Sequence, residues 1–176
     1  MNFSKADLAG ALFIGSKLCR SLFENASLTM ADFSFADMRE INLSHADLRG
    51  ARLVHATLSK ARMAGASLQS ILIEDRGKSQ EHSTQLNGAQ INEANLAGCD
   101  LRKAVLHGSD LSGSILSNAD VAGCDFSKAN LTGIDTSKVN LKLANLAQII
   151  GLNDPKANYL KIITMFTMAA SNLFWH

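Results

Sequence analysis

The chain has 176 residues, and its 17 Lys and Arg against 16 Asp and Glu give a formal net charge of +1. The length suits one domain, and the balanced charge argues against a nucleic-acid-binding surface, which needs clustered Lys and Arg. The same balance argues against a rod that is acidic over its whole length.

Most of the chain repeats a five-residue pattern. An apolar residue stands at every fifth position from Phe3 to Ile73 and again from Leu86 to Leu146, with Thr136 as the exception. Two residues before most of these positions stands a small residue, most often Ala. A period of five fits neither an α-helix, which repeats every 3.6 residues, nor a flat strand, which repeats every two. The pattern therefore predicts a solenoid.

The repeat resembles the unit of the pentapeptide-repeat family, which reads Ala-(Asp/Asn)-Leu-x-x. Close copies are Ala6-Asp7-Leu8, Ala31-Asp32-Phe33, Ala94-Asn95-Leu96 and Ala129-Asn130-Leu131. The resemblance implies an all-β solenoid, a right-handed quadrilateral β-helix with four units in each coil. The two series then make about seven coils.

Four units per coil place residues twenty apart on top of one another. The large residue of each unit should point into the solenoid, together with the small residue two before it. The expected core includes Phe3, Phe13, Phe23, Phe33, Leu48, Leu96, Leu111, Phe126 and Leu131. Phe3 should stack on Phe23, and Phe13 on Phe33, at the interstrand spacing of about 4.8 Å. Each coil contacts only its neighbours, so stability is close to a sum of nearest-neighbour interactions.

The same stacking arranges charged side chains in surface columns. Arg20, Glu40 and Lys60 share one column, and such exposed ion pairs contribute little to stability. Asp100 and Asp120 stack as like charges. We expect this acidic column to be costly.

The pattern breaks first between Glu74 and Thr84, where a polar segment interrupts domain 1–152. We expect a loop at 74–84 that leaves the solenoid about midway, and loops in otherwise regular solenoids are often functional. The candidate partner-binding residues are Glu74, Asp75, Arg76, Lys78, Glu81 and His82. A tolerated insertion without a role is the alternative.

The second break follows Leu146. Near its end the series is already irregular, because Ile134 takes a small position and Thr136 a large one. The last coils are therefore expected to be distorted or wider.

Residues 153–176 change to helical spacing. Asp154 and Pro155 suit a helix start, and apolar residues then recur every three or four positions. The candidate residues are Tyr159, Ile162, Ile163, Phe166, Leu173, Phe174 and Trp175. We expect a C-terminal amphipathic helix that caps the open end of the solenoid and also joins two copies as a homodimer. A cap alone and a peripheral membrane contact are the alternatives.

No catalytic or metal-binding grouping stands out. The histidines lack the i, i+4 spacing of a helical metal pair, and no Walker-type loop occurs. Cys99 and Cys124 take small inward positions and should be inert, whereas Cys19 should be more exposed. A narrow, filled solenoid offers no substrate cavity. We therefore expect a protein that is not an enzyme and needs no cofactor or metal.

These observations favour a non-enzymatic protein–protein interaction module or scaffold, with a partner protein that the sequence does not name. The alternative from the resemblance is a DNA-mimicking modulator of DNA gyrase or topoisomerase, similar to pentapeptide proteins that protect gyrase from quinolones. Basic residues spread along the chain, among them Arg49, Arg52 and Arg102, speak against DNA imitation. Direct nucleic-acid binding is not expected. The first repeat begins at once, which favours a cytoplasmic location without a signal peptide.

Overall fold

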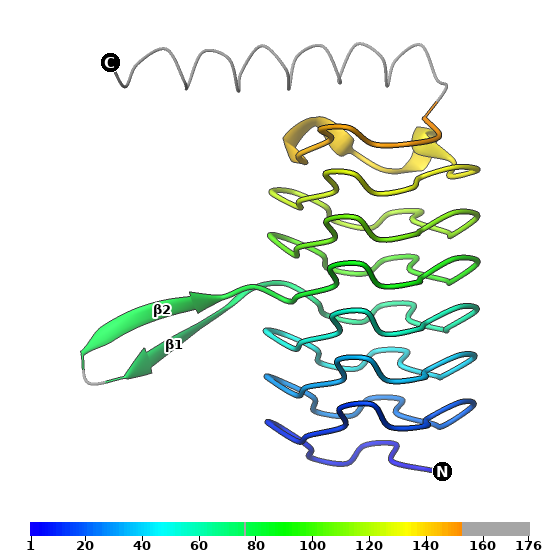
Figure 1. Cartoon of the computed structure of the whole chain (residues 1–176). Coiled ribbons are helices and arrows are strands. Elements are labelled where there is room, and N and C mark those ends of the chain that lie inside the picture. The colour runs from blue at the N-terminus through cyan, green and yellow to red at the C-terminus, as the bar shows by residue number, and fades with distance from the viewer. Residues whose placement is uncertain (76, 153–176) are drawn as a thin grey trace.

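The structure is a computed structural model that describes residues 1–75 and 77–152. It is a rod of stacked coils from which one hairpin projects about midway (Figure 1). The predicted C-terminal helix at 153–176, with its candidate residues from Tyr159 to Trp175, lies outside the described residues. Arg76 of the predicted loop also lies outside them.

Parallel pairing between residues twenty positions apart builds the coils. Asn2 pairs with Leu22 in this way, and the same spacing continues up the rod. Across the hairpin the spacing rises to 33, as between Arg52 and Gln85 (85 − 52 = 33), and it returns to twenty between Gln85 and Val105. The insertion thus adds thirteen residues (33 − 20 = 13) to one coil. The units after it still occupy the same sides of the solenoid as the units before it.

Each unit of the regular coils ends in a tight corner with positive φ. The corner residue lies two positions after the large inward residue, from Lys5 (φ 63°) in the first series to Gln148 (φ 57°) in the second. Glycine adopts such angles without steric cost, and it occupies several of these corners, among them Gly98 at φ 65°. Other residues adopt the same angle because the next coil holds their backbone, as when Arg20 N–H donates to the Arg39 carbonyl at 3.0 Å.

The large residues of the repeat form one continuous core. Those that are at most 1% exposed include Phe23, Phe33, Leu48, Leu96, Leu111, Phe126 and Leu131. The predicted ring stacking is present, since the centroids of Phe3 and Phe23, and those of Phe13 and Phe33, lie 4.8 Å apart. Phe3 and Phe13 are only partly buried, because they belong to the first coil and pack against a coil on one side only.

The segment that leaves the solenoid is a β-hairpin, and the prediction of a loop at 74–84 was wrong in both shape and bounds. Strand β1 covers Ile71–Asp75 and pairs antiparallel with strand β2, Lys78–His82. Ile73, expected to be the last inward residue of its series, lies in β1 instead. Ile73 ends a short apolar run with two β-branched residues, Ile71 and Ile73, and such a run fits a strand as well as it fits the five-residue period. Thr84, expected in the loop, is buried in the solenoid.

The last coils are distorted, as the exchange of large and small residues predicted. Two 3-10 helices, η1 at Thr136–Lys138 and η2 at Leu141–Leu143, replace regular units there. The side chains of Asp135 and Asn140 cap them by accepting hydrogen bonds from backbone N–H groups. The altered composition of these units therefore changes the local backbone and not only the packing.

Candidate functional site

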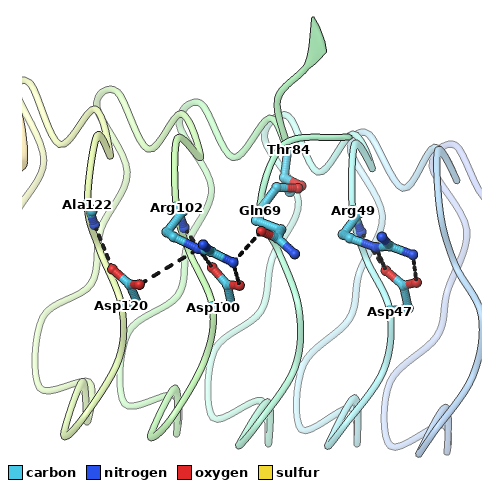
Figure 2. Close-up of polar contacts among 8 residues, drawn as sticks. All are labelled: Asp47, Arg49, Gln69, Thr84, Asp100, Arg102, Asp120 and Ala122. Atoms are coloured by element: carbon cyan, nitrogen blue, oxygen red, sulfur yellow. Dashed lines mark hydrogen bonds and ion pairs between the residues drawn. The ribbon is translucent and has the colours of Figure 1, made fainter. Parts of the chain in front are cut away.

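A buried threonine fixes the hairpin to the solenoid. Thr84 is 0% exposed, and its hydroxyl accepts a hydrogen bond from the backbone N–H of Gly50 at 3.0 Å. The same hydroxyl lies 3.0 Å from the carbonyl oxygen of Leu48 and 3.4 Å from that of Gln69, and its single proton can be donated to one of them at a time. Figure 2 shows Thr84 beside Gln69, at the point where the hairpin meets its coil.

The Thr84 hydroxyl takes the place of one backbone acceptor in the ladder between coils. At the same corner one coil earlier, Met30 N–H donates to the Arg49 carbonyl at 3.0 Å. By that pattern Gly50 N–H would donate to the carbonyl of Gln69, but it donates to Thr84 instead. A buried N–H without an acceptor costs about 1–3 kcal/mol, so the hydroxyl compensates for the break that the hairpin makes in the ladder.

Both strands of the hairpin pack over Gly50 at their base. A β-carbon built on Gly50 would lie 2.6 Å from Met30 Sδ, 2.8 Å from Ile71 Cγ2 and 3.5 Å from His82 Cβ. A side chain at this position would require Met30 or Ile71 to move, and the φ of +68° also favours glycine. Ile71 and His82 are register partners in β1 and β2, so both strands of the hairpin contact the solenoid at Gly50.

A charged contact ties the hairpin to the coil that follows it. Glu81 of β2 accepts a hydrogen bond from Lys103 Nζ at 2.6 Å and another from Ser70 Oγ at 2.6 Å. The hydrogen bond from Lys103, and then that from Ser70, lowers the pKa of Glu81. The base of the hairpin thus contacts the preceding coil through Gly50 and the following coil through Lys103.

A column of charged residues runs along the solenoid beside this base (Figure 2). Arg102 donates to Asp100 through Nε at 2.9 Å and Nη2 at 2.7 Å, and to Gln69 Oε1 at 2.6 Å. Its Nε also lies 3.7 Å from a carboxylate oxygen of Asp120. Burial alone would raise the pKa of Asp100, but the hydrogen bonds and charge of Arg102 outweigh burial and lower it.

The acidic column that the sequence predicts is present, but it is not made of like charges alone. Asp100 and Asp120 are paired on adjacent coils, as expected, and Arg102 contacts both carboxylates. The spacing of twenty residues identifies only side chains that stack within one column, whereas Arg102 belongs to the neighbouring column. The sequence signal was the Arg two residues after the Asp, which recurs at Asp47 and Arg49 with a distance of 2.7 Å.

Other surface charges are also paired across coils. Arg20 donates to Glu40 through two nitrogens at 3.0 Å each, in the predicted column. Lys60 lies 3.4 Å from Glu93 of the next coil, where the hairpin raises the spacing to 33 (93 − 60 = 33). This mixture of both signs differs from the uniformly negative backbone of DNA, and it does not favour DNA imitation.

The described members of the predicted partner-binding set lie at two places on the hairpin. Glu74 and Lys78 are exposed near the tip, whereas Glu81 and His82 lie at the base, where they contact the solenoid. Asp75 is the register partner of Lys78. The sequence analysis missed the anchoring residues, namely Gly50, Ile71, Thr84 and Lys103. The short apolar run 71–73, in which Ile71 and Ile73 are β-branched, followed by Gly77, was the signal that could have revealed the strands.

The described residues offer little for catalysis. No group of three or more His, Cys, Asp and Glu side chains among them could hold a metal ion. Cys99 and Cys124 are buried and Cys19 is exposed, as predicted. Burial raises the pKa of the Cys99 thiol to about 12, so its reactive thiolate is scarce at neutral pH. In residues 1–75 and 77–152 no helix has the length and apolar character needed to cross a bilayer.

The model of the family described as "Pentapeptide repeats" matches the sequence in 8 copies, over residues 2–39, 36–71, 84–123 and 124–148. The chain belongs to the pentapeptide-repeat family, whose fold is the right-handed quadrilateral β-helix. Residues 72–83, which lie between the matched segments, belong to the hairpin and its junction with the solenoid.

Several solved structures resemble this chain. HetL, a pentapeptide repeat protein involved in heterocyst differentiation regulation in the cyanobacterium Nostoc sp. strain PCC 7120, is 31% identical, with 85% of this chain and 71% of HetL covered and a TM-score of 0.37. Full-length QnrB1, a plasmid-mediated fluoroquinolone resistance protein, is 23% identical, with coverages of 93% and 84% and a TM-score of 0.41. A protein of the Arabidopsis thaliana thylakoid lumen is 24% identical, with coverages of 73% and 67% and a TM-score of 0.28. No curated protein matches the sequence.

Proposed function

We propose that the protein is a non-enzymatic interaction module that binds a partner protein through the hairpin β1–β2. The supporting observation is the anchoring of the hairpin by the Thr84 hydroxyl, the packing over Gly50 and the ion pair of Glu81 with Lys103. These contacts hold the projecting hairpin at a fixed place on the solenoid, which suits a binding element. Leu72, the register partner of Glu81, is 67% exposed, so the hairpin offers an apolar side chain to a partner beside its anchored base.

The solenoid suits the role of a rigid support. Its interior is filled by stacked side chains that are almost fully buried, so a partner reaches only the outer surface and the hairpin. Because each coil is hydrogen-bonded to the next, the hairpin keeps its place along the rod.

The test uses a chain that lacks residues 71–83 and therefore keeps the register of the repeat. In cells of the source organism, the full chain and the shortened chain each carry a proximity-labelling enzyme. Proteins that are labelled by the full chain and lost with the shortened chain would support the proposal. The same labelled proteins with both chains would contradict it. The variant Thr84→Val, which keeps the hairpin and loses its anchoring hydroxyl, should weaken labelling without abolishing it.

DNA gyrase is the alternative partner, and a supercoiling assay tests it. Purified gyrase is assayed for DNA supercoiling with the full chain, in the presence and absence of a quinolone. An unchanged supercoiling rate in both conditions would remove this alternative.

We further propose that the protein acts in the cytoplasm and that residues 153–176 join two copies. Light scattering of the full chain against a chain ending at Gly151 tests the second point. A dimer that becomes a soluble monomer on truncation supports assembly through this segment, whereas two monomers contradict it.

A further inference from the structure

We infer that the free edge of strand β1 binds an extended segment of the partner, which adds to the hairpin as a third, antiparallel strand. This inference rests on the proposed function and gives the chemistry of the partner. It predicts a segment with a basic residue followed two positions later by an apolar one.

The register of the hairpin determines which backbone groups of β1 are open. Asp75 and Lys78 are register partners joined by two residues, and such a two-residue turn closes on a hydrogen-bonded pair. Hydrogen-bonded and non-hydrogen-bonded pairs alternate along an antiparallel ladder. Ile73 is therefore bonded to β2, and the N–H and C=O groups of Leu72 and Glu74 point away from it. Within the described residues, none of these groups makes a backbone hydrogen bond to the solenoid.

The edge of β1 is better suited to strand addition than the edge of β2. Strand β1 reads Ile-Leu-Ile-Glu-Asp and strand β2 reads Lys-Ser-Gln-Glu-His, and β-branched and apolar residues favour strands. Near its base β2 is also covered by Lys103, which reaches Glu81 from the following coil. In Figure 1, β1 is the strand on the side of the N-terminal coils, away from that contact.

The apolar half of strand β1 is an open edge, and its charged half restricts what can pair with it. Natural edge strands are blunted by shortness, charged side chains, Pro or a bulge. Strand β1 carries charge at Glu74 and Asp75 only, contains no Pro, and pairs with β2 without interruption from Ile71 to Asp75. Its apolar side chain at Leu72 is 67% exposed. Carboxylates on an edge disfavour an acidic strand and favour a basic one, so this edge is suited to pairing with a segment that carries a basic residue.

The side chains of β1 give the chemistry of the added strand. Leu72 and Glu74 project from the same face, because residues two apart in a strand share a face, and both are exposed. On an antiparallel third strand, an apolar residue opposite Leu72 would cover it, and a Lys or Arg opposite Glu74 would pair with its carboxylate. Because the added strand runs in the opposite direction, its basic residue precedes its apolar residue by two positions.

The experiment uses the ¹⁵N-labelled full chain and a synthetic peptide, acetyl-Thr-Val-Lys-Thr-Val-Thr-amide, with Glu in place of Lys as the control peptide. Hydrogen exchange followed by NMR reports each amide of the hairpin. The Lys peptide should slow exchange at Leu72 and Glu74 about tenfold, leave Ser79 and Glu81 unchanged, and bind about tenfold more tightly than the Glu peptide. No slowing at Leu72 and Glu74, slowing at Ser79 and Glu81 instead, or equal binding of both peptides would overturn the inference.

Proline variants separate the two edges. Glu74→Pro removes an outward N–H from β1 and leaves the bonds to β2 intact, and Ser79→Pro does the same on β2. Glu74→Pro should abolish the peptide-induced slowing at Leu72, whereas Ser79→Pro should preserve it. Glu74→Gln keeps the backbone and should remove only the preference for the Lys peptide. If Glu74→Pro and Ser79→Pro respond alike, the inference is wrong.

The cell-labelling experiment distinguishes this inference from the proposed function. Labelling that is lost without residues 71–83 and unchanged in Glu74→Pro would mean that the hairpin binds its partner by another surface, so the inference fails and the proposed function stands. Labelling that is unchanged both in the chain without residues 71–83 and in Glu74→Pro would contradict the inference and the proposed function alike. A purified chain that self-associates only when residues 71–83 are present would identify a second copy as the occupant, and would overturn the basic, apolar partner segment.

Discussion

The backbone nitrogen of Gly50 and the hydroxyl oxygen of Thr84 lie 3.0 Å apart, in a buried hydrogen bond between residues 34 positions apart. This bond sits where the spacing of the coil ladder changes from twenty to 33. A side chain therefore supplies the acceptor that the hairpin displaces, and the hairpin is attached to the fold at a defined point.

Removing the Thr84 hydroxyl should destabilise the protein. Thr84→Val keeps the shape of the side chain and leaves Gly50 N–H without its acceptor, so we expect a loss of about 1–3 kcal/mol in the free energy of unfolding. Thr84→Ser keeps the hydroxyl and should lose less. Urea unfolding measures the stability, and hydrogen exchange of the Gly50 amide reports the bond itself. Equal losses in the two variants would show that packing of the methyl group, and not the hydrogen bond, is responsible.

Removing the whole hairpin should leave a folded solenoid. Deletion of residues 71–83 removes thirteen residues (83 − 70 = 13) and places Leu86 five positions after Leu68, as the repeat requires (86 − 13 = 73 and 73 − 68 = 5). Thr84 then follows Ser70 in a small position. We expect the shortened chain to have the circular dichroism spectrum of the full-length solenoid and to unfold in a cooperative thermal transition.

Deletion of only residues 71–82 is the matched control. It leaves one extra residue, so inward and outward positions exchange at the junction, and we expect a lower melting temperature than in the thirteen-residue deletion. If the two deletions melt alike, the junction tolerates a shift in register and the hairpin is not a modular insertion.

The regular part of this fold could be predicted because every unit obeys the same rule. Phe3 stacks on Phe23 since any two residues twenty apart in the first series occupy equivalent places, and the centroid distance of 4.8 Å agrees with the spacing of stacked coils. The distortion near Thr136 was predictable for the same reason, because a break in the pattern marks a break in the coil.

The anchoring of the hairpin could not be predicted in this way. The contact between Gly50 and Thr84 depends on the path of the hairpin, which no period describes. The pairing of Arg102 with Asp100 has a local signal, the Arg two residues after the Asp, but the contact of Arg102 with Asp120 joins neighbouring columns. The repeat relates only residues within a column, so the five-residue pattern alone does not give such contacts.

An alanine at Gly50 should disturb the hairpin base more than the same change elsewhere. Gly50→Ala and Gly98→Ala both impose positive φ on alanine (+68° and +65°), but a β-carbon at Gly98 meets nothing within 4 Å, whereas at Gly50 it meets Ile71 Cγ2 at 2.8 Å. Strain alone should cost about 1–2 kcal/mol in each. We expect an additional loss in Gly50→Ala, together with faster hydrogen exchange in β1 and β2. Equal stability and exchange in the two variants would mean that Ile71 yields without cost.

The charge column should show coupling between Arg102 and Asp120. Arg102→Met leaves Asp100 and Asp120 as neighbouring like charges, so we expect a lower melting temperature, and Asp120→Asn added to it should restore part of the loss. Arg49→Met is the control, because Asp47 has Ser67 and not an acidic residue as its partner on the next coil. A double-mutant cycle measures the coupling. If the two changes are additive, Arg102 does not offset the repulsion between the carboxylates.

Acid should weaken the fold partly through Asp100. The pKa of its carboxyl is lowered in the folded protein from an ordinary value of 3.8, because the hydrogen bonds and charge of Arg102 outweigh burial. A carboxyl with a lowered folded pKa stabilises the fold fully above its ordinary pKa, and this contribution is lost as the pH falls through 3.8 towards the folded pKa. We therefore expect the free energy of unfolding to fall more steeply between about pH 5 and pH 3 in the wild-type chain than in Asp100→Asn. Urea unfolding across this range measures both slopes. Parallel curves would indicate that other carboxylates, among them Asp37 with its bond to Arg39, account for the acid sensitivity.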